Sequence, residues 1–156
     1  MLNICFLDTD TIDENLDLTA LKRFGHLTAY KMTQPEQIAQ RIYDQDIVII
    51  NSEIYLNETN LKDASRVKLI CVAATGTNNV DLEYARSRGI TVCNVPSYST
   101  RSVAQHTFAM LFYLLESMPF YDAFVKSGQY QNSNSVNYLK RNYWELSNKT
   151  WGIIGL

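Results

Sequence analysis

Short apolar runs alternate with amphipathic segments over the first 98 residues. Five of these runs have the length and composition of strands, and they lie at 3–8, 26–30, 46–52, 67–74 and 90–95. The third run contains four consecutive apolar residues, which is typical of a parallel strand that is buried on both faces, and the fourth run is the strongest strand signal in the chain. Strands alternating with short helices predict right-handed βαβ units. The expected fold is therefore α/β, with a flavodoxin-like parallel sheet covered by helices on both faces.

Helix boundaries can be placed from their capping residues. Gly25 fits the C-cap of a helix over 17–24, and Thr33-Gln-Pro-Glu36 matches a capping box that opens a helix to about Tyr43. A weaker short helix is expected over 58–64. Asp81 is placed to cap a further helix, which should end at Gly89.

The pattern changes at Ser99. Ser99 or Thr100 can cap a helix that runs to about Met118, and its apolar residues cover more than one stripe. We therefore expect this helix to be buried on more than one side. Pro119 should break or kink it, because proline lacks the N–H that continues a helix.

Beyond the proline, the chain alternates again between helix, loop and strand. A second helix is expected over 120–127, ending at Gly128, and residues 129–143 are rich in Asn, Ser and aromatic residues. This segment reads as a long surface loop. The chain finishes on Gly-Ile-Ile-Gly-Leu, which predicts a buried parallel strand that runs into a glycine turn at Gly155.

Composition narrows the class of protein. Hydrophobic residues make up 46% and charged residues 19% of the 156 residues, which is globular composition. The net charge is −2 with no basic run, so neither nucleic acid nor an anionic membrane is an expected partner. No signal peptide is apparent, and the apolar run at 108–115 is too short to span a bilayer.

The number and placement of the cysteines indicate the cellular compartment. Cys5, Cys71 and Cys93 each lie in a predicted strand, without the spacing of metal ligands. They are interpreted as buried, reduced thiols of a cytoplasmic protein, and no metal site is expected.

The sharpest candidate for chemistry is Ala73-Ala-Thr-Gly-Thr-Asn-Asn79, which follows the strongest strand and precedes a capped helix. Gly76 would permit a tight turn and close approach of a ligand to the backbone. Successive amides in such a turn can hold a carboxylate or a phosphate, and the helix N-terminus behind them adds partial positive charge. Taken alone, however, the segment is better explained as an ordinary strand-to-helix turn.

Three polar residues elsewhere are candidates for functional groups. Asp8 and Asp10 follow the first strand and could hold Mg²⁺, as in a phosphoacceptor receiver domain, but Asn51 stands where that class would place a third aspartate. A solvated acidic loop is the preferred interpretation. His106 could be a general base, although a helical histidine without an evident partner is more often a hydrogen-bonded core or interface residue.

Two segments together resemble the D-isomer-specific 2-hydroxyacid dehydrogenases. They are "VKLICVAATGTNNVDLEYARSRGITVCNVPSYSTRSVAQHTFAMLFYLL" (67–115) and "WELSNKTWGIIGL" (144–156), with glycerate dehydrogenases, hydroxypyruvate reductases and phosphoglycerate dehydrogenase nearest in character. The resemblance implies a flavodoxin-like substrate domain over 1–98. It also implies that 99–156 holds the linking helix and first strand of a truncated Rossmann domain.

The resemblance also implies site residues. It places the substrate carboxylate on the turn at Thr75 and Gly76, with Asn79 beside it, and the nicotinamide cofactor, NAD or NADP, near Thr75, Thr100 and Gly155. The catalytic histidine, its carboxylate partner and the substrate-binding arginine would lie beyond residue 156, so the chain itself should be inactive. By the same resemblance, a homodimer is expected through the helix at 100–118.

Two other classes remain open at this stage. The chain could be a stand-alone flavodoxin-like module that binds a small carboxylate or phosphate. It could also be a non-catalytic relative that keeps the dehydrogenase fold for protein interaction.

Overall fold

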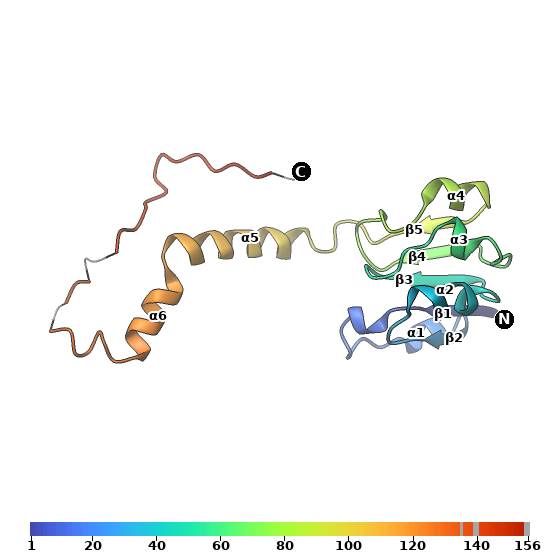
Figure 1. Cartoon of the computed structure of the whole chain (residues 1–156), viewed down its shortest axis with the longest axis horizontal. Coiled ribbons are helices and arrows are strands. Elements are labelled where there is room, and N and C mark those ends of the chain that lie inside the picture. The colour runs from blue at the N-terminus through green and yellow to red at the C-terminus, as the bar shows by residue number, and fades with distance from the viewer. Residues whose placement is uncertain (135, 139–140, 155–156) are drawn as a thin grey trace. The chain divides into compact units, whose positions relative to one another are not determined.

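The computed structural model describes residues 1–134, 136–138 and 141–154. The chain divides into two compact units, Met1–Tyr98 and Ser99–Leu156. The first contains the sheet and its helices, and the second contains two helices followed by irregular chain (Figure 1).

The first unit is a five-stranded parallel sheet. Its elements are β1 (Leu2–Phe6), a 3₁₀ turn (Thr9–Thr11), α1 (Thr19–Lys22), β2 (Gly25–Ala29), α2 (Pro35–Ile42), β3 (Ile47–Ile50), α3 (Glu58–Leu61), β4 (Leu69–Val72), α4 (Leu82–Ser87) and β5 (Thr91–Cys93). The strand order is β2-β1-β3-β4-β5, and every pairing is parallel. This is the flavodoxin-like order, so the α/β prediction is confirmed.

Two apolar layers hold the sheet. The larger layer contains Val48, Ile50 and Ile70 from the strands, all fully buried, together with Ile42 of α2 and Leu61 of α3. The smaller layer, on the opposite face, is built around Ile4, Phe6 and Ile49, and α1 contributes partly buried residues to it. Three helices therefore cover one face of the sheet, whereas one four-residue helix covers part of the other.

Two predicted helix boundaries are wrong. Gly25 is not a C-cap, because it is the first residue of β2 and has no positive φ. A side chain there would place its Cβ 2.1 Å from the carbonyl oxygen of Leu2, so glycine is required by close approach of two strands. The capping box of α2 is formed by Gln34 and Gln37, one residue later than predicted.

Thr33 has a different role from the one its sequence position indicated. Its hydroxyl donates to the carbonyl oxygen of Leu7, and it accepts a hydrogen bond from Arg41 at 2.6 Å. This residue therefore ties the start of α2 to the end of β1.

The boundaries of α4 follow the prediction. The side chain of Asp81 accepts a hydrogen bond from the N–H of Tyr84 at 2.9 Å, as an N-cap should. Gly89 has φ +67° after the helix. The N–H of Gly89 donates to Arg86 and that of Ile90 to Ala85, which is the hydrogen-bond pair of a Schellman motif.

The second unit begins with α5 (Thr100–Leu115), which is joined to α6 (Met118–Lys126) through Ser117 at φ +49°. The break near Pro119 is confirmed, since this proline lies in the first turn of α6. The expectation that the first helix is buried on more than one side is wrong, because no residue of α5 is buried. The unit instead packs a small aromatic cluster around Phe124 of α6.

The strand predicted at the end of the chain is absent from residues 151–154. A strand is stabilised by hydrogen bonds to a neighbour, and none is recorded for this segment among the described residues. Ile153 and Ile154 are exposed. The indole ring of Trp151 packs edge-on against the ring of Phe108, with 5.0 Å between ring centroids.

Within the described part of the chain, no single helix is long and apolar enough to cross a bilayer. The pair α5 and α6, bent by 62°, reaches that length and composition only when the two are taken together.

Candidate functional site

The segment from Ala73 to Val80 leaves the carboxyl end of β4 and leads to α4. Thr75 and Gly76 are exposed on it, whereas Asn79 and Val80 are buried. The carboxyl ends of parallel strands are where open α/β sheets bind ligands. This position makes the segment, called here the β4 turn (residues 73–80), the leading candidate site.

The β4 turn offers unpaired donors. Among the described residues, no protein acceptor is recorded for the backbone N–H groups of Thr75, Gly76 and Thr77. Exposed N–H groups in succession can receive the oxygens of a carboxylate. Helix α4 behind them has only six residues, so its N-terminus adds little partial positive charge. The amides themselves are therefore the main attraction for an anion.

Gly76 does not have a backbone conformation that requires glycine. No residue of the β4 turn has positive φ, so the turn is an open bend and lacks the alternating handedness of a typical amide nest. A Cβ at Gly76 would lie 3.0 Å from the side-chain oxygen of Asn78, an atom that can rotate away. The glycine therefore leaves room above the turn and is not required by the backbone.

The β4 turn is fastened to the segment after β5. The N–H of Val95 donates to the carbonyl oxygen of Ala74 at 3.0 Å, and the Thr75 hydroxyl donates to the carbonyl oxygen of Val95 at 3.2 Å. The side-chain amide of Asn94 donates to the carbonyl oxygen of Thr75 at 2.6 Å. The exposed amides at Thr75 and Gly76 are thus held in place by two strand ends.

Asn79 fastens the same turn on its other side. Its side-chain N–H₂ group donates to the carbonyl oxygens of Asn51 at 2.7 Å and Ile54 at 2.9 Å, and the residue is only 7% exposed. Both donors of this amide are therefore engaged by the loop after β3. The geometry gives Asn79 a positioning role, because these bonds hold the β4 turn against the neighbouring loop.

A second polar network lies where β1 and β3 end. Asp8 is 1% exposed and accepts the N–H of Asn51 at 2.8 Å, so the interpretation of this residue as part of a solvated loop is wrong. Burial raises the pKa of the Asp8 carboxyl, and hydrogen bonds from the backbone of Asn51 and Glu53 oppose that shift. The Asn51 side chain donates to Thr11 at 3.0 Å.

Sequence reasoning missed Asn51 and Asn94 as structural parts of this region. Both directly follow a strand, and the side chain of each donates to the backbone of a neighbouring loop. Asparagine at the carboxyl end of a strand was therefore a usable signal. The partners of these two side chains could not be identified from the sequence, because they are 40 and 19 residues away.

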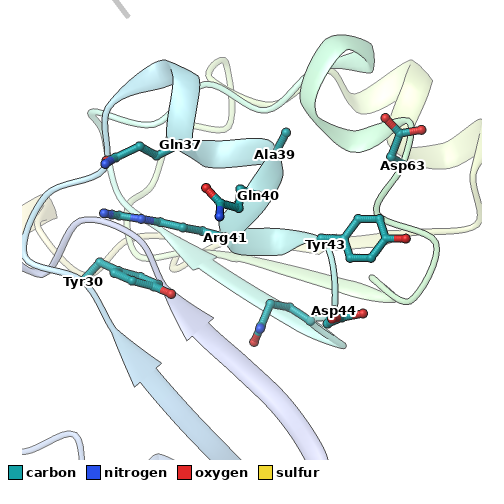
Figure 2. A pocket seen from close by; sticks show the side chains of 9 residues that line it. Tyr30, Gln37, Ala39, Gln40, Arg41, Tyr43, Asp44 and Asp63 are labelled. Atoms are coloured by element: carbon teal, nitrogen blue, oxygen red, sulfur yellow. The ribbon is translucent and has the colours of Figure 1, made fainter.

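A pocket lies elsewhere in the first unit. It is a pocket of about 1000 Å³ along α2 that includes Tyr30, Arg41 and Asp44 but no residue of the β4 turn (Figure 2). Arg41 lies over the ring of Tyr30, with 4.0 Å from Cζ to the ring centroid, and donates to the carbonyl oxygen of Met32 at 2.8 Å. The same nitrogen, Nη1, also donates to the hydroxyl oxygen of Thr33.

The remaining predicted residues do not belong to the first unit. Thr100 is exposed in the first turn of α5, in the second unit. Gly155 lies outside the described residues. His106 is exposed on α5, so it is not a core residue of this unit. Across the described residues, no group of three or more His, Cys, Asp or Glu could hold a metal ion.

A comparison with protein families decides the relationship. The family described as "D-isomer specific 2-hydroxyacid dehydrogenase, catalytic domain" matches residues 6–145. The chain belongs to this family. The match includes the β4 turn and both asparagines that fasten it.

Curated relatives agree. A putative 2-hydroxyacid dehydrogenase of Haemophilus influenzae is 34% identical over 99% of this chain and 49% of its own length. A glycerate dehydrogenase of Methylorubrum extorquens is 31% identical over 97% of this chain and 48% of its own length. A hydroxypyruvate reductase of Blautia hydrogenotrophica is 31% identical over 90% of this chain and 44% of its own length. The chain thus spans about half the length of these relatives.

Solved structures show the same fold. A D-lactate dehydrogenase from Aquifex aeolicus, in complex with NAD and lactic acid, superimposes with a TM-score of 0.73 at 24% identity, covering 92% of this chain and 41% of that one. A D-2-hydroxyisocaproate dehydrogenase superimposes with a TM-score of 0.66 at 20% identity, covering 88% and 42%.

Proposed function

We propose that this chain is the N-terminal part of an oxidoreductase that exchanges a hydride between a nicotinamide cofactor and a small D-2-hydroxy acid or 2-oxo acid. The glycerate and hydroxypyruvate type is preferred, because two of the named relatives carry those activities. Under this proposal, residues 1–98 are the substrate domain and residues 99–156 begin the NAD-binding domain.

The observation that carries the proposal is the β4 turn. It lies at the carboxyl end of a parallel strand, its exposed N–H groups have no protein acceptor among the described residues, and two neighbouring loops fasten it. In the proposed enzyme, the amides at Thr75 and Gly76 hold the substrate carboxylate. Asn79 keeps those amides in position through its bonds to the loop after β3.

The described residues provide only part of what a dinucleotide needs. Thr75 and Thr100 are exposed hydroxyl residues that suit contacts with the nicotinamide end, while the glycine fingerprint would begin at Gly155, outside the described residues. When bound, NAD or NADP would supply the hydride. The acid-base histidine, its carboxylate partner and the arginine are expected beyond residue 156. By itself, the chain should therefore bind 2-oxo acids weakly and not turn them over.

The test is an activity assay on two proteins. The 156-residue chain is incubated with NADH or NADPH and a panel that includes hydroxypyruvate and glyoxylate, and we expect no turnover above a mock-purified control. In the whole protein, Gly76→Val should fill the space above the turn and raise KM for the 2-oxo acid at least tenfold. Asn78→Ala is the matched control, because that side chain is exposed on the same turn. Turnover by the chain alone, or unchanged kinetics in Gly76→Val, would overturn the proposal.

A further inference from the structure

Two cysteines lie side by side on the face of the sheet that carries the smaller apolar layer. Cys71 of β4 and Cys93 of β5 are direct partners in the parallel register of these strands. Residues paired in this way have side chains on the same face of the sheet. Both thiols are free, and Cys93 is exposed, so the expectation that all three cysteines are buried is wrong.

Their spacing falls within the range of a disulfide. Neighbouring strands lie about 4.8 Å apart, and disulfides join residues whose Cα atoms are about 4.4–6.8 Å apart. The two side chains leave the sheet in parallel directions, whereas the side chains of an unstrained disulfide point toward each other. A bond of this kind stores strain and is reduced more readily than a structural disulfide.

Access differs between the two sulfurs. Cys93 is exposed on the edge strand, whereas Cys71 is half-buried. Burial raises the pKa of the Cys71 thiol, and the neighbouring Cys93 raises it further. The third cysteine, Cys5, is fully buried on the opposite face, and burial raises its pKa to about 12. An oxidant in solution therefore meets Cys93 first and has no comparable access to Cys5.

We propose that Cys71 and Cys93 form a dithiol site that a small disulfide, such as glutathione disulfide, oxidises to an intrachain disulfide. The Cys93 thiolate attacks one sulfur of glutathione disulfide, forming a mixed disulfide and releasing one glutathione thiolate. The Cys71 thiolate then attacks the Cys93 sulfur and releases the second glutathione. Two protein thiols lose two protons and two electrons, and one glutathione disulfide becomes two glutathione molecules.

The site adjoins the β4 turn. Cys93 directly precedes Asn94, whose side chain holds the carbonyl oxygen of Thr75, and Cys71 is four residues before Thr75. Closing a bond between the two strands would alter the spacing of the segments that fasten the turn. This consequence for ligand binding rests on the proposed function, whereas the thiol chemistry does not.

The experiment uses the 156-residue chain, so it is independent of any dehydrogenase activity. After treatment with glutathione disulfide, the remaining thiols are alkylated and the protein is digested with trypsin. We expect a loss of two alkylatable thiols and a cross-linked pair of peptides, 69–86 and 89–101. The cross-link should form at the same rate when the protein is diluted tenfold, and it should form faster as the pH is raised.

Four variants define the outcome. Cys5→Ser should cross-link as the unmodified protein does. Cys71→Ser should hold glutathione on residue 93, and Cys93→Ser should form no cross-link. The fourth, Cys93→Ser combined with Thr91→Cys, moves the thiol two positions along the same face. A shift of two residues is about 6.6 Å along the strand, which takes the Cα atoms beyond the roughly 7 Å limit for a disulfide. The cross-link should then fall at least tenfold.

Two results would overturn the proposal. One is a stable glutathione adduct on Cys93 of the unmodified protein without a bond to Cys71. The other is a cross-link that joins two chains, which would disappear on dilution. Either result would show that the register of β4 and β5 does not create a dithiol site.

Discussion

Replacing Asn79 by alanine tests whether this side chain holds the β4 turn in place. The substitution removes two hydrogen bonds, to the carbonyl oxygens of Asn51 and Ile54, while leaving the backbone pairing between Leu56 and Val80 intact. A hydrogen bond of this kind contributes about 0.5–1.5 kcal/mol net, and a buried acceptor left without a donor costs about 1–3 kcal/mol. Because the bond to Ile54 is buried and the bond to Asn51 only partly so, we expect a total loss of about 2–3 kcal/mol.

The assay is urea unfolding of the 156-residue chain, followed by far-ultraviolet circular dichroism. Asn79→Ala should lower the unfolding midpoint without changing the slope of the transition, whereas the control Asn78→Ala should stay within about 0.5 kcal/mol of the unmodified protein. Equal effects of the two substitutions would refute the reasoning. In that case Asn79 would not be a positioning residue of the β4 turn.

Three further predictions follow from the packing and charges. Gly25→Ala should destabilise the first unit by at least about 2 kcal/mol in urea unfolding, because its Cβ would lie 2.1 Å from a backbone oxygen, whereas Gly76→Ala should cost less than about 0.5 kcal/mol. The pKa of the Asp46 carboxyl is lowered in the folded protein, mainly by the hydrogen bond from the N–H of Asn3 at 2.7 Å and then by Arg66. The stability that ionised Asp46 contributes is therefore present above pH 3.8, and it is lost as the pH falls through the lowered pKa of the folded state. Asp46→Asn should flatten the pH dependence of unfolding below about pH 4, and an unchanged slope would contradict this. The exposed apolar face of α5 should drive self-association. Phe112→Glu should therefore weaken dimers at least tenfold in sedimentation equilibrium, whereas Gln105→Glu should not. A clean monomer of the unmodified chain at micromolar concentration would show that this expectation is wrong.

The sheet could be predicted from the sequence because its signal is local. Continuous apolar runs such as the one at β3 mark buried parallel strands, and the Asp81 cap and Gly89 mark the ends of α4. The order of the strands was not predicted beyond the flavodoxin-like class, because it depends on pairings between segments that are distant in the sequence. All five strands nevertheless lie within the predicted runs or one residue outside them.

The errors arise where a residue's role depends on a distant partner. Gly25 looked like a helix cap, although its reason for being glycine is the carbonyl oxygen of Leu2, 23 positions earlier. Asp8 looked solvated because acidic residues near strand ends commonly are, yet the N–H of Asn51 makes its burial possible. Helix α5 looked buried because its composition is apolar, and composition does not specify what covers a helix.

The position of the candidate site could be predicted from the sequence, whereas the hydrogen bonds that hold it could not. The β4 turn was identified from its position between a strand and a capped helix. The sequence could not show that Asn79 points into the neighbouring loop, or that Asn94 holds Thr75. The sequence indicated a tight turn at Gly76, where the structure has an open bend without positive φ.

The central claim is that the exposed amides of the β4 turn receive the carboxylate of a small 2-hydroxy or 2-oxo acid. The most direct measurement is a titration of the ¹⁵N-labelled chain with D-glycerate, followed by amide chemical shifts. Glycerol at the same concentration and sodium chloride at matched ionic strength serve as controls. The account predicts saturable shifts centred on Thr75, Gly76 and Thr77, which the controls do not reproduce. Shifts absent from these amides, or equal in sodium chloride, would contradict it.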